Sequence, residues 1–309
     1  MAEIGGVRVK HKKPFNLTIR QRDNIWGYAF ILPCVIIFLI FTIYPFCYSA
    51  FLSMQEKVGT NITDLQFAGA KQFIKAFQSK EMWNSFKVTA LYTFPTVFFH
   101  LAIGLSLAML VNKSIHLKGL VRAMYFVPVI LSTVVISMVW KFMLSPKVGL
   151  FNLFLSNFGI DPDIAWLKSP KLAMTAVIIV GVWKWIGYFM VLYLAALQDI
   201  PVSLYEAAEI DGANGLQKFF KITFPLLGNT TQFLMIISVI NTFQVFDQIF
   251  MMTGGGPIKR TDVIVYYIYR QAFQIYDMPY ASAVSWLLFV VIFVLTALQM
   301  RISKEKMEY

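Results

Sequence analysis

Charged residues are scarce in this chain, and their scarcity excludes most soluble proteins. Of its 309 residues 14% are charged and 58% are hydrophobic, and the mean hydropathy is +0.65. Soluble globular domains carry about 25% charged residues, so the composition indicates an integral membrane protein. A helix needs about 20 apolar residues to cross the hydrocarbon core. Several spans and their loops therefore use nearly the whole length and leave little room for a soluble domain.

Cysteine and histidine are also rare. The two cysteines, Cys34 and Cys47, lie thirteen positions apart in one apolar segment, about 20 Å along a helix, which is too far for a disulfide. We expect both to be inert free thiols in the packed core. The three histidines, at positions 11, 100 and 116, are scattered, so we expect no metal site and no metal-dependent membrane enzyme. His100 is alone in an apolar segment, where a packed or hydrogen-bonded side chain is the expected role.

Nucleotide-binding and nucleic-acid-binding motifs are missing. No glycine-rich phosphate loop followed by Lys-Ser/Thr occurs, so we expect this chain to bind no ATP itself. The formal net charge is +11, but the basic residues are spread over loops without zinc-ligand spacing or a basic helix interleaved with aromatics. The lipid bilayer, and not nucleic acid, is therefore the expected environment of the basic residues.

Six apolar runs are present, and they predict an all-α polytopic membrane protein. The predicted spans are residues 26–52, 86–111, 121–143, 172–197, 224–251 and 281–301. The first is expected to remain as an anchor, because about 25 polar and basic residues precede it and no small-residue cleavage site follows. The chain is thus divided into a basic segment, 1–25, and a six-span domain, 26–309.

The distribution of lysine and arginine predicts the orientation. Basic residues gather before the first span, between the second and third, and after the last: Arg8, Lys10, Lys12, Lys13, Arg20 and Arg22; Lys113, Lys118 and Arg122; Arg301, Lys304 and Lys306. By the positive-inside rule both termini are cytoplasmic, and so is the loop 198–224. Other loops carry some lysines, so the basic amino terminus decides. In an outer loop, Ala68–Gln78 has helical apolar spacing.

The cytoplasmic loop contains a small polar cassette, "SLYEAAEIDGANGLQKFF". Ser203 followed by Glu206 predicts a capping box, so a helix is expected to begin near Ser203. Gly212 and Gly215 should end it before a second helix. Its small residues, Ala207, Ala208 and Ala213, permit close approach by another protein. An amphipathic connector at the lipid headgroups is the alternative.

Polar residues also occur inside the predicted spans. Four polar residues would share one face of the fifth span, within about a 120° arc, if that span is one helix. Such a shared polar face indicates a wet pathway or a partner helix. The residues are Asn241, Gln244, Asp247 and Gln248. Lys184 lies near the middle of the fourth span. It either pairs with Asp247 or faces the translocation path, where a cation would favour an acidic, uronate-containing oligosaccharide.

The cassette and several other stretches resemble one family. The cassette matches the pattern EAA, three residues, Gly, nine residues, Ile, x, Leu-Pro, except that Phe224 replaces Leu. The matching residues are Glu206, Ala207, Ala208, Gly212, Ile222 and Pro225. Other stretches are similar to carbohydrate importer permeases of the maltose and glycerol-phosphate type. They are "YPFCYSAFLSM", "FAGAKQFIKAF", "WNSFKVTALYT", "FVPVILSTVVISMVWKFM", "YLAALQDIPVSLYEAAEIDGA" and "MMTGGGP". The chain therefore resembles a type I ATP-binding-cassette importer permease.

The resemblance implies roles for particular residues. The cassette would be the coupling helix that contacts the ATPase, through Glu206, Ala207, Ala208, Asp211 and Gly212. The substrate path would include Thr133, Ser137, Lys184, Tyr188, Asn241, Gln244, Asp247 and Gln248, with Trp or Tyr rings as stacking surfaces. The binding protein would dock at the loop formed by Gly254, Gly255, Gly256 and Pro257. The alternative is that this loop is a plain tight turn.

The resemblance also implies partners. They are a second, similar permease, two copies of a cytoplasmic ATPase that holds ATP and Mg, an extracytoplasmic sugar-binding protein and an oligosaccharide, in a bacterial cytoplasmic (inner) membrane. The competing hypothesis is an ion-coupled secondary transporter that uses Lys184 and Asp247, for which inverted repeats are expected and not found. A membrane enzyme is the third, and it lacks any nucleophile or metal arrangement.

Overall fold

The computed structural model describes residues 18–58, 64–113, 118–159 and 161–307. The chain divides into two compact units, Met1–Phe51 and Leu52–Tyr309. In the first, α1 (Ile19–Phe38), η1 (Leu39–Ile43) and most of α2 (Tyr44–Ser53) follow one another without a break. They contain an apolar stretch of 31 residues, Asp23–Ser53, which includes the predicted first span. Both cysteines are free, as expected, but both are exposed on this unit, so the expected core position is wrong. Most basic residues of the predicted segment 1–25 lie outside the described residues.

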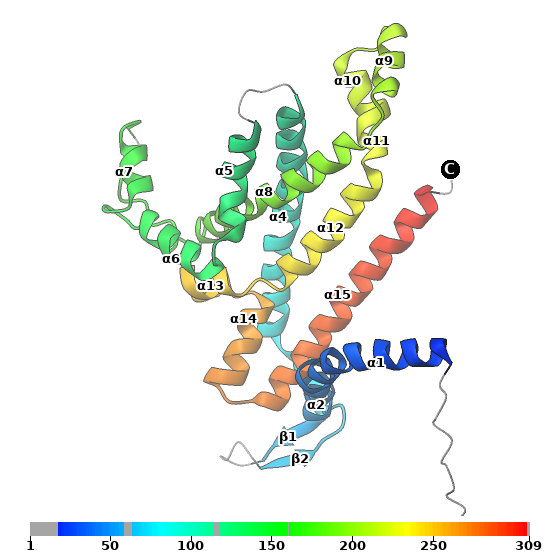
Figure 1. Ribbon diagram of the computed structural model, residues 1–309. Helices are drawn as coiled ribbons and strands as arrows, with labels where there is room; N and C mark the ends of the chain where they lie inside the picture. The colour runs from blue at the N-terminus through cyan, green and yellow to red at the C-terminus, as the bar shows by residue number, and fades with distance from the viewer. Residues whose placement is uncertain (1–17, 59–63, 114–117, 160, 308–309) are drawn as a thin grey trace, which may run out of the picture. The chain divides into compact units, whose positions relative to one another are not determined.

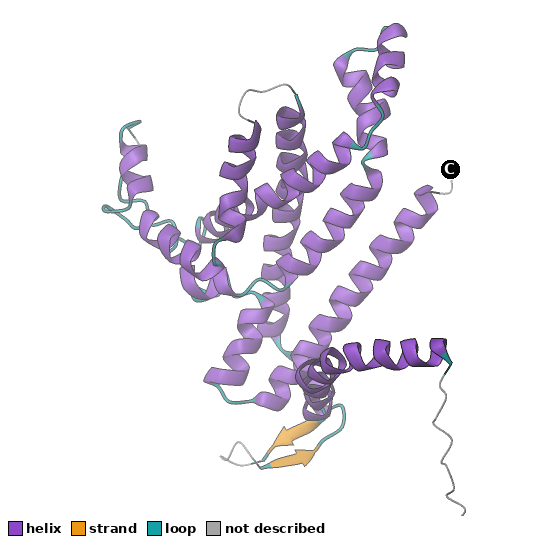
Figure 2. Ribbon diagram, viewed as in Figure 1, coloured by secondary structure: helices purple, strands orange, loops and turns teal. Residues whose placement is uncertain are grey.

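The described part of the second unit consists of helices joined by loops, with one two-stranded hairpin (Figure 2). Strand β1 (Gln55–Lys57) pairs with β2 (Leu65–Phe67) in antiparallel register, with Glu56 opposite Gln66. These short strands are not predicted from the sequence. Helix α3 (Lys71–Gln78) follows and is the amphipathic helix expected in Ala68–Gln78. It buries Ala76 completely and packs against α15 (Met278–Met307).

Three long helices form the centre of this unit (Figure 1). Helix α8 (Ala173–Gln198) packs along α4 (Lys80–Asn112), and α12 (Gly228–Phe243) packs against both. Helix α4 begins where the side chain of Ser79 accepts a hydrogen bond from the Met82 N–H, as an N-cap residue does. Because α4 and α8 bury much of their surface inside the unit, their residues are the ones placed to form an internal site.

Two of the predicted spans consist of helix pairs that are bent at a break. Helices α5 (Lys118–Ile130) and α6 (Thr133–Met143) meet at 98°. The second bend, of 64°, lies between α12 and the continuous segment Gly215–Leu226. That segment consists of α10 (Gly215–Lys218), η2 (Phe219–Thr223) and α11 (Phe224–Leu226). Among the described residues, four helices are long and apolar enough to cross a membrane, or six if each bent pair is one span. Six is the predicted number.

The remaining elements connect the spans. They are α7 (Leu150–Ser156), α9 (Val202–Ile210), α13 (Asp247–Met252), α14 (Ile264–Tyr269) and η3 (Arg270–Gln274). Helix α13 packs against α6, and α14 packs against α4 and α15. The predicted fifth span, 224–251, is wrong at its end, because α12 stops at Phe243 and the chain turns before α13. Phe246, at φ −136° and ψ −63°, is outside the helical region.

Candidate functional site

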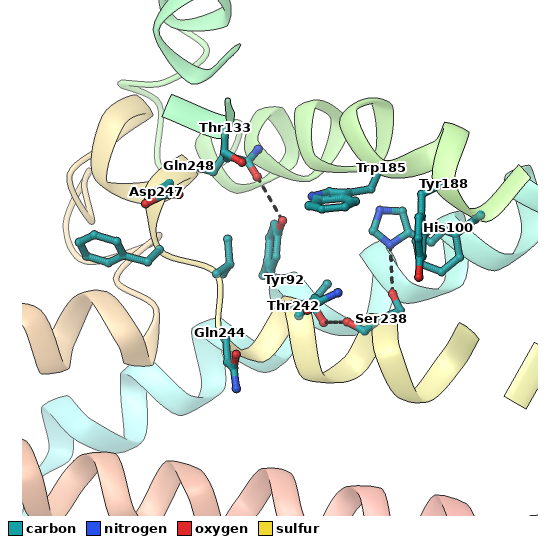
Figure 3. Close-up of a pocket in the computed structure, with 14 residues that line it drawn as sticks. Tyr92, His100, Thr133, Trp185, Tyr188, Ser238, Thr242, Gln244, Asp247 and Gln248 are labelled. Carbon is teal, nitrogen blue, oxygen red and sulfur yellow. Dashed lines mark hydrogen bonds between the residues drawn. The ribbon is translucent and has the colours of Figure 1, made fainter. Parts of the chain in front are cut away.

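A cavity of about 230 Å³ lies among five helices of the second unit (Figure 3). Its walls are formed by helices α4, α6, α8, α12 and α13 and by the turn after α12. Its lining consists of aromatic rings, amides, hydroxyls, one histidine and one carboxylate. The residues are Tyr92, His100, Thr133, Trp185, Tyr188, Phe189, Ser238, Asn241, Thr242, Gln244, Val245, Phe246, Asp247 and Gln248.

Gln248 connects three of these helices. Its Nε2 donates to the Val177 carbonyl of α8 at 2.6 Å, and its Oε1 accepts from the Tyr92 hydroxyl of α4 at 3.2 Å. The side chain is buried, so both amide groups find the partners that burial requires. Gly181 of α8 makes this approach possible, because a Cβ there would lie 2.6 Å from the Tyr92 hydroxyl. The start of α13 is thereby fixed to the centre of the unit.

His100 connects α4 to α12. Its Nδ1 lies 3.0 Å from the Ser238 hydroxyl, and its ring stacks on Phe189 with centroids 4.5 Å apart. Figure 3 shows this bond beside the Thr242 hydroxyl, which donates to the Ser238 carbonyl one turn earlier at 2.7 Å. The packed and hydrogen-bonded role expected for His100 is what the structure shows.

Six of the eight predicted path residues line the cavity, and two do not. The six that line it are Thr133, Tyr188, Asn241, Gln244, Asp247 and Gln248. Ser137 is fully buried, and its hydroxyl donates to the Thr133 carbonyl at 2.7 Å. That bond within α6 satisfies the hydroxyl locally.

Lys184 makes backbone contacts and not the predicted pair with Asp247, whereas the alternative that it faces the translocation path stays a prediction. The side chain is buried, and its Nζ donates to the Leu131 carbonyl at 3.2 Å and to the Val129 carbonyl at 3.5 Å. Both side chains lie within the described residues, and no ion pair joins Lys184 to Asp247 there. The lysine is also absent from the cavity lining. The pair with Asp247 was expected because the break between α5 and α6, which supplies the carbonyls, was not foreseen.

The shared helix face predicted for Asn241, Gln244, Asp247 and Gln248 is also wrong. Helix α12 ends at Phe243, so only Asn241 lies in it, and Asp247 and Gln248 begin α13. The four residues still line one cavity, because the turn between the two helices brings them together. Asp247 lies in the first turn of α13, where a carboxylate is favoured by the helix dipole.

Sequence reasoning missed Tyr92, Ser238 and Thr242 as lining residues. A signal was available, since α4 carries buried polar residues at helical spacing: Ser85, Thr89, Tyr92, Thr93, Thr96 and His100. Several of them bond within the helix, as Thr89 does to the Ser85 carbonyl. A polar stripe of this kind in an apolar helix indicates a face turned away from lipid.

The cassette forms two short helices, but its capping differs from the prediction. Helix α9 begins at Val202 after Pro201, and no side chain caps it, so the Ser203–Glu206 capping box does not form. Ser203 is the second residue of the helix, two residues past the N-cap position that Pro201 holds. The capping box belongs to α10 instead, where Asn214 and Gln217 exchange side-chain to backbone hydrogen bonds of 2.9 and 2.8 Å.

The two cassette helices stand together at one end of the second unit (Figure 1). An ion pair between Glu209 and Lys218 joins them, and the hydrogen bond from Lys218 lowers the pKa of the Glu209 carboxyl. Four of the five predicted ATPase contacts are exposed, namely Glu206, Ala207, Asp211 and Gly212. The fifth, Ala208, is half-buried. The described part of the cassette therefore presents a small, rigid surface to its surroundings.

The predicted docking loop follows α13. Gly254 and Gly255 have φ of +57° and +76°, which glycine adopts without strain. A Cβ on Gly255 would lie 2.7 Å from the Tyr266 ring, so the loop is pressed against α14. The Thr261 hydroxyl donates to Thr253 Oγ1 at 2.7 Å. Gly256 and Pro257 are half-buried in the same turn.

An ionic network lies beneath this loop. Arg270 donates to Asp262 at 2.9 Å and lies 3.7 Å from Glu81, which also pairs with Lys259. Burial raises the pKa of the Asp262 carboxyl, and the guanidinium of Arg270 opposes that rise. The network ties the loop to the start of α4 and to η3.

Comparisons with known proteins agree with these features. Residues 100–307 match the family described as binding-protein-dependent transport system inner membrane component. The trehalose/maltose transport system permease protein MalF of Thermococcus litoralis is 34% identical over 94% of this chain and 98% of its own length. The sn-glycerol-3-phosphate transport system permease protein UgpA of Agrobacterium fabrum is 32% identical over 93% and 97%.

Solved structures give the same result. A chain from a bacterial ABC transporter involved in the import of the acidic polysaccharide alginate superposes with a TM-score of 0.80 at 27% identity, covering 92% of this chain and 96% of the other. A chain from a bacterial alginate ABC transporter in complex with alginate pentasaccharide-bound periplasmic protein gives a TM-score of 0.81. This chain has the type I importer permease fold and belongs to the family of binding-protein-dependent transport system inner membrane components.

Proposed function

We propose that this chain is the permease subunit of an ATP-driven importer that moves an oligosaccharide into the cytoplasm by alternating access. The observation that carries the proposal is the cavity, which combines aromatic rings with amide and hydroxyl groups. Sugars have apolar ring faces and hydroxyl rims, so Trp185 and Tyr188 suit the faces while Asn241 and Gln244 suit the rims. The similarity to sugar transport permeases supports the same substrate class.

The cavity forms only part of the substrate path in this proposal. Its volume of about 230 Å³ is below the ~300–1,000 Å³ of sites that enclose a whole ligand. A second, similar permease would face it and supply the other wall. The sugar would arrive from an extracytoplasmic binding protein docked at Gly254–Pro257, with the complex in a bacterial inner membrane and both termini of this chain cytoplasmic.

The charge of the lining favours a neutral oligosaccharide. Among the described lining residues there is no lysine or arginine, whereas Asp247 is a carboxylate. Lys184, on which an acidic preference would rest, donates to backbone carbonyls instead. The likeness to an alginate importer keeps a uronate oligosaccharide as the alternative, in which case the facing permease would supply the cation.

Coupling to ATP would run through the cassette. Two ATPase subunits that hold ATP and Mg would bind the exposed face of α9 on this chain and the equivalent helix of the second permease. ATP binding can shift a permease between two states only through contacts that differ between those states. The Glu209–Lys218 pair and the capping box stiffen the cassette, so a displacement of α9 would reach α12 through α10, η2 and α11.

Reconstitution tests this function. The chain is co-expressed with its neighbouring permease, ATPase and binding-protein genes, and the complex is placed in lipid nanodiscs. We expect ATP hydrolysis to rise several-fold when the binding protein carries its sugar, and neutral oligosaccharides to stimulate more than uronate oligosaccharides. Uptake by this chain alone in vesicles, driven by an ion gradient without ATP, would instead support the secondary transporter that uses Lys184 and Asp247.

A further inference from the structure

The ammonium of Lys184 occupies the end of a broken helix. Helix α5 ends at Ile130, and the carbonyls of its last turn have no partner within the helix. Lys184 Nζ, from α8, lies 3.2 Å from the Leu131 carbonyl and 3.5 Å from the Val129 carbonyl. A cation at a helix C-terminus is also favoured by the helix dipole. One side chain thus satisfies carbonyls that would otherwise lie unpaired inside the membrane.

Two cavity residues depend on this arrangement. Thr133 is the first residue of α6, directly after the break, and it lines the cavity. Trp185 also lines it, and the Lys184 ammonium lies 4.6 Å from the centroid of the Trp185 ring, in cation–π geometry. The lysine therefore lies outside the cavity but contacts the groups that set two parts of its wall.

The α8 helix approaches the break closely enough to make these contacts rigid. A Cβ on Gly187 would lie 1.9 Å from the Tyr125 carbonyl of α5, so the two backbones are in direct contact. On the other side of the cavity Gln248 fastens α13 to α8 through the Val177 carbonyl at 2.6 Å, and α13 packs against α6. Helix α5 is thus held to α8 at Gly187, and α13, against which α6 packs, is held to α8 at Gln248.

We propose that Lys184 is a positioning residue, which fixes the angle between α5 and α6 and so places Thr133 and Trp185 for the sugar. It would act through backbone carbonyls without touching the cargo. The functional part of this inference rests on the proposed sugar transport, whereas its structural part does not.

A pair of substitutions tests the functional part in the reconstituted complex. Lys184→Met keeps the length of the stem and removes the charge, and Lys184→Arg keeps a donor. Losing hydrogen bonds from a charged group should loosen the site, so we expect the sugar concentration for half-maximal uptake to rise about 3- to 10-fold in Lys184→Met. The maximal rate should change less, and Lys184→Arg should recover part of the loss. Lys168→Met, at an exposed lysine, is the control.

A distance measurement tests the structural part without any sugar. After Cys34→Ser and Cys47→Ser, spin labels are attached at Phe142 of α6 and Ile179 of α8, which are 61% and 53% exposed. We expect one narrow distance distribution in the parent and in Lys184→Arg, and a broad or shifted one in Lys184→Met. An unchanged distribution in Lys184→Met would overturn the inference even if sugar transport is confirmed.

A change of cargo preference gives a second contrary outcome. If Lys184→Met weakens uptake of acidic oligosaccharides alone and leaves neutral ones unaffected, the lysine contacts the cargo and is not a positioning residue. If the complex transports no sugar at all, the proposed function fails, and the label distances still decide whether Lys184 holds the break.

Discussion

Single glycines determine how closely α8 can approach its neighbours. Gly104 of α4 lies against Phe189, where a Cβ would be 2.7 Å from the Phe189 Cβ, and Gly187 lies against the backbone of α5. Small residues allow such backbone approach in membrane helices, where packing replaces the hydrophobic effect as the driving force. Gly104 and Ala108, four residues apart, are both buried. They therefore mark a helix-packing seam.

Replacing Gly187 should be strongly disruptive. Its added Cβ would lie 1.9 Å from the Tyr125 carbonyl oxygen, a backbone atom that cannot rotate away. We expect Gly187→Ala to lower the thermal midpoint of the purified protein by several degrees, because overpacking typically costs about 1–3 kcal/mol. Gly119→Ala, where nothing lies within 4 Å, should leave the midpoint unchanged. Equal midpoints for the two variants would refute the close contact of α5 and α8.

Two ion pairs of different burial should differ in strength. Asp262 and Arg270 have side-chain exposures of 1% and 21%, whereas Lys147 and Asp163 have 74% and 50%. Breaking a buried pair leaves a desolvated charge, so Arg270→Gln should destabilise by about 2–4 kcal/mol. Lys147→Gln should change stability by less than about 1 kcal/mol. Thermal unfolding of both variants measures the difference, and a larger shift for Lys147→Gln would contradict it.

At the scale of elements, the sequence predicts helices better than it predicts their ends. Apolar runs place the long helices to within several residues, because lipid requires about 20 apolar residues. These breaks were missed because neither contains a glycine or proline: Leu131 and Ser132 lie between α5 and α6, and Gln244, Val245 and Phe246 lie between α12 and α13. The carbonyls that bind Lys184 are backbone groups, which composition cannot reveal. Six of the residues predicted for the path still line one cavity, since polar groups inside spans are informative wherever the helices end.

The turn between α9 and α10 should tolerate substitution at one glycine but not at the other. Gly212 has φ +76°, while Gly215 is the first residue of α10, and nothing crowds a Cβ at either position. Gly212→Ala should therefore strain the turn by about 1 kcal/mol and misplace α9. We expect it to reduce the sugar transported per ATP hydrolysed in the reconstituted complex, and Gly215→Ala to leave that ratio unchanged. A normal ratio for Gly212→Ala would show that the turn does not transmit ATPase closure.

At the scale of the whole molecule, the loop after α13 and the cassette lie on elements joined through α12. The loop follows α13, which α12 precedes, and α12 follows the cassette helices in sequence. A binding protein at the loop and an ATPase at the cassette would therefore act on the same continuous stretch of chain. Coupling of this kind is reciprocal, since each partner changes the affinity for the other by the same factor.

Gly255 offers a test of that coupling. Gly255→Ala adds a Cβ 2.7 Å from the Tyr266 ring, whereas Gly159→Ala adds one at the same φ of +76° with nothing within 4 Å. Both variants carry similar backbone strain, and only the first shifts the docking loop. We expect Gly255→Ala to weaken stimulation of ATP hydrolysis by the sugar-loaded binding protein about tenfold and Gly159→Ala to have little effect. Equal effects would assign the loss to backbone strain and not to the loop.

The broken α5–α6 span also constrains how the protein is made. Its two helices have 13 and 11 residues, each too short to cross the bilayer alone. A lysine at the centre of a span opposes insertion by about 2.5–3.5 kcal/mol, and α8 carries one at Lys184. During synthesis α5 and α6 emerge before α8, so neither the bare carbonyls nor the ammonium meets its partner at first. We therefore expect these segments to enter lipid from the translocon as one group, after the ribosome has completed α8.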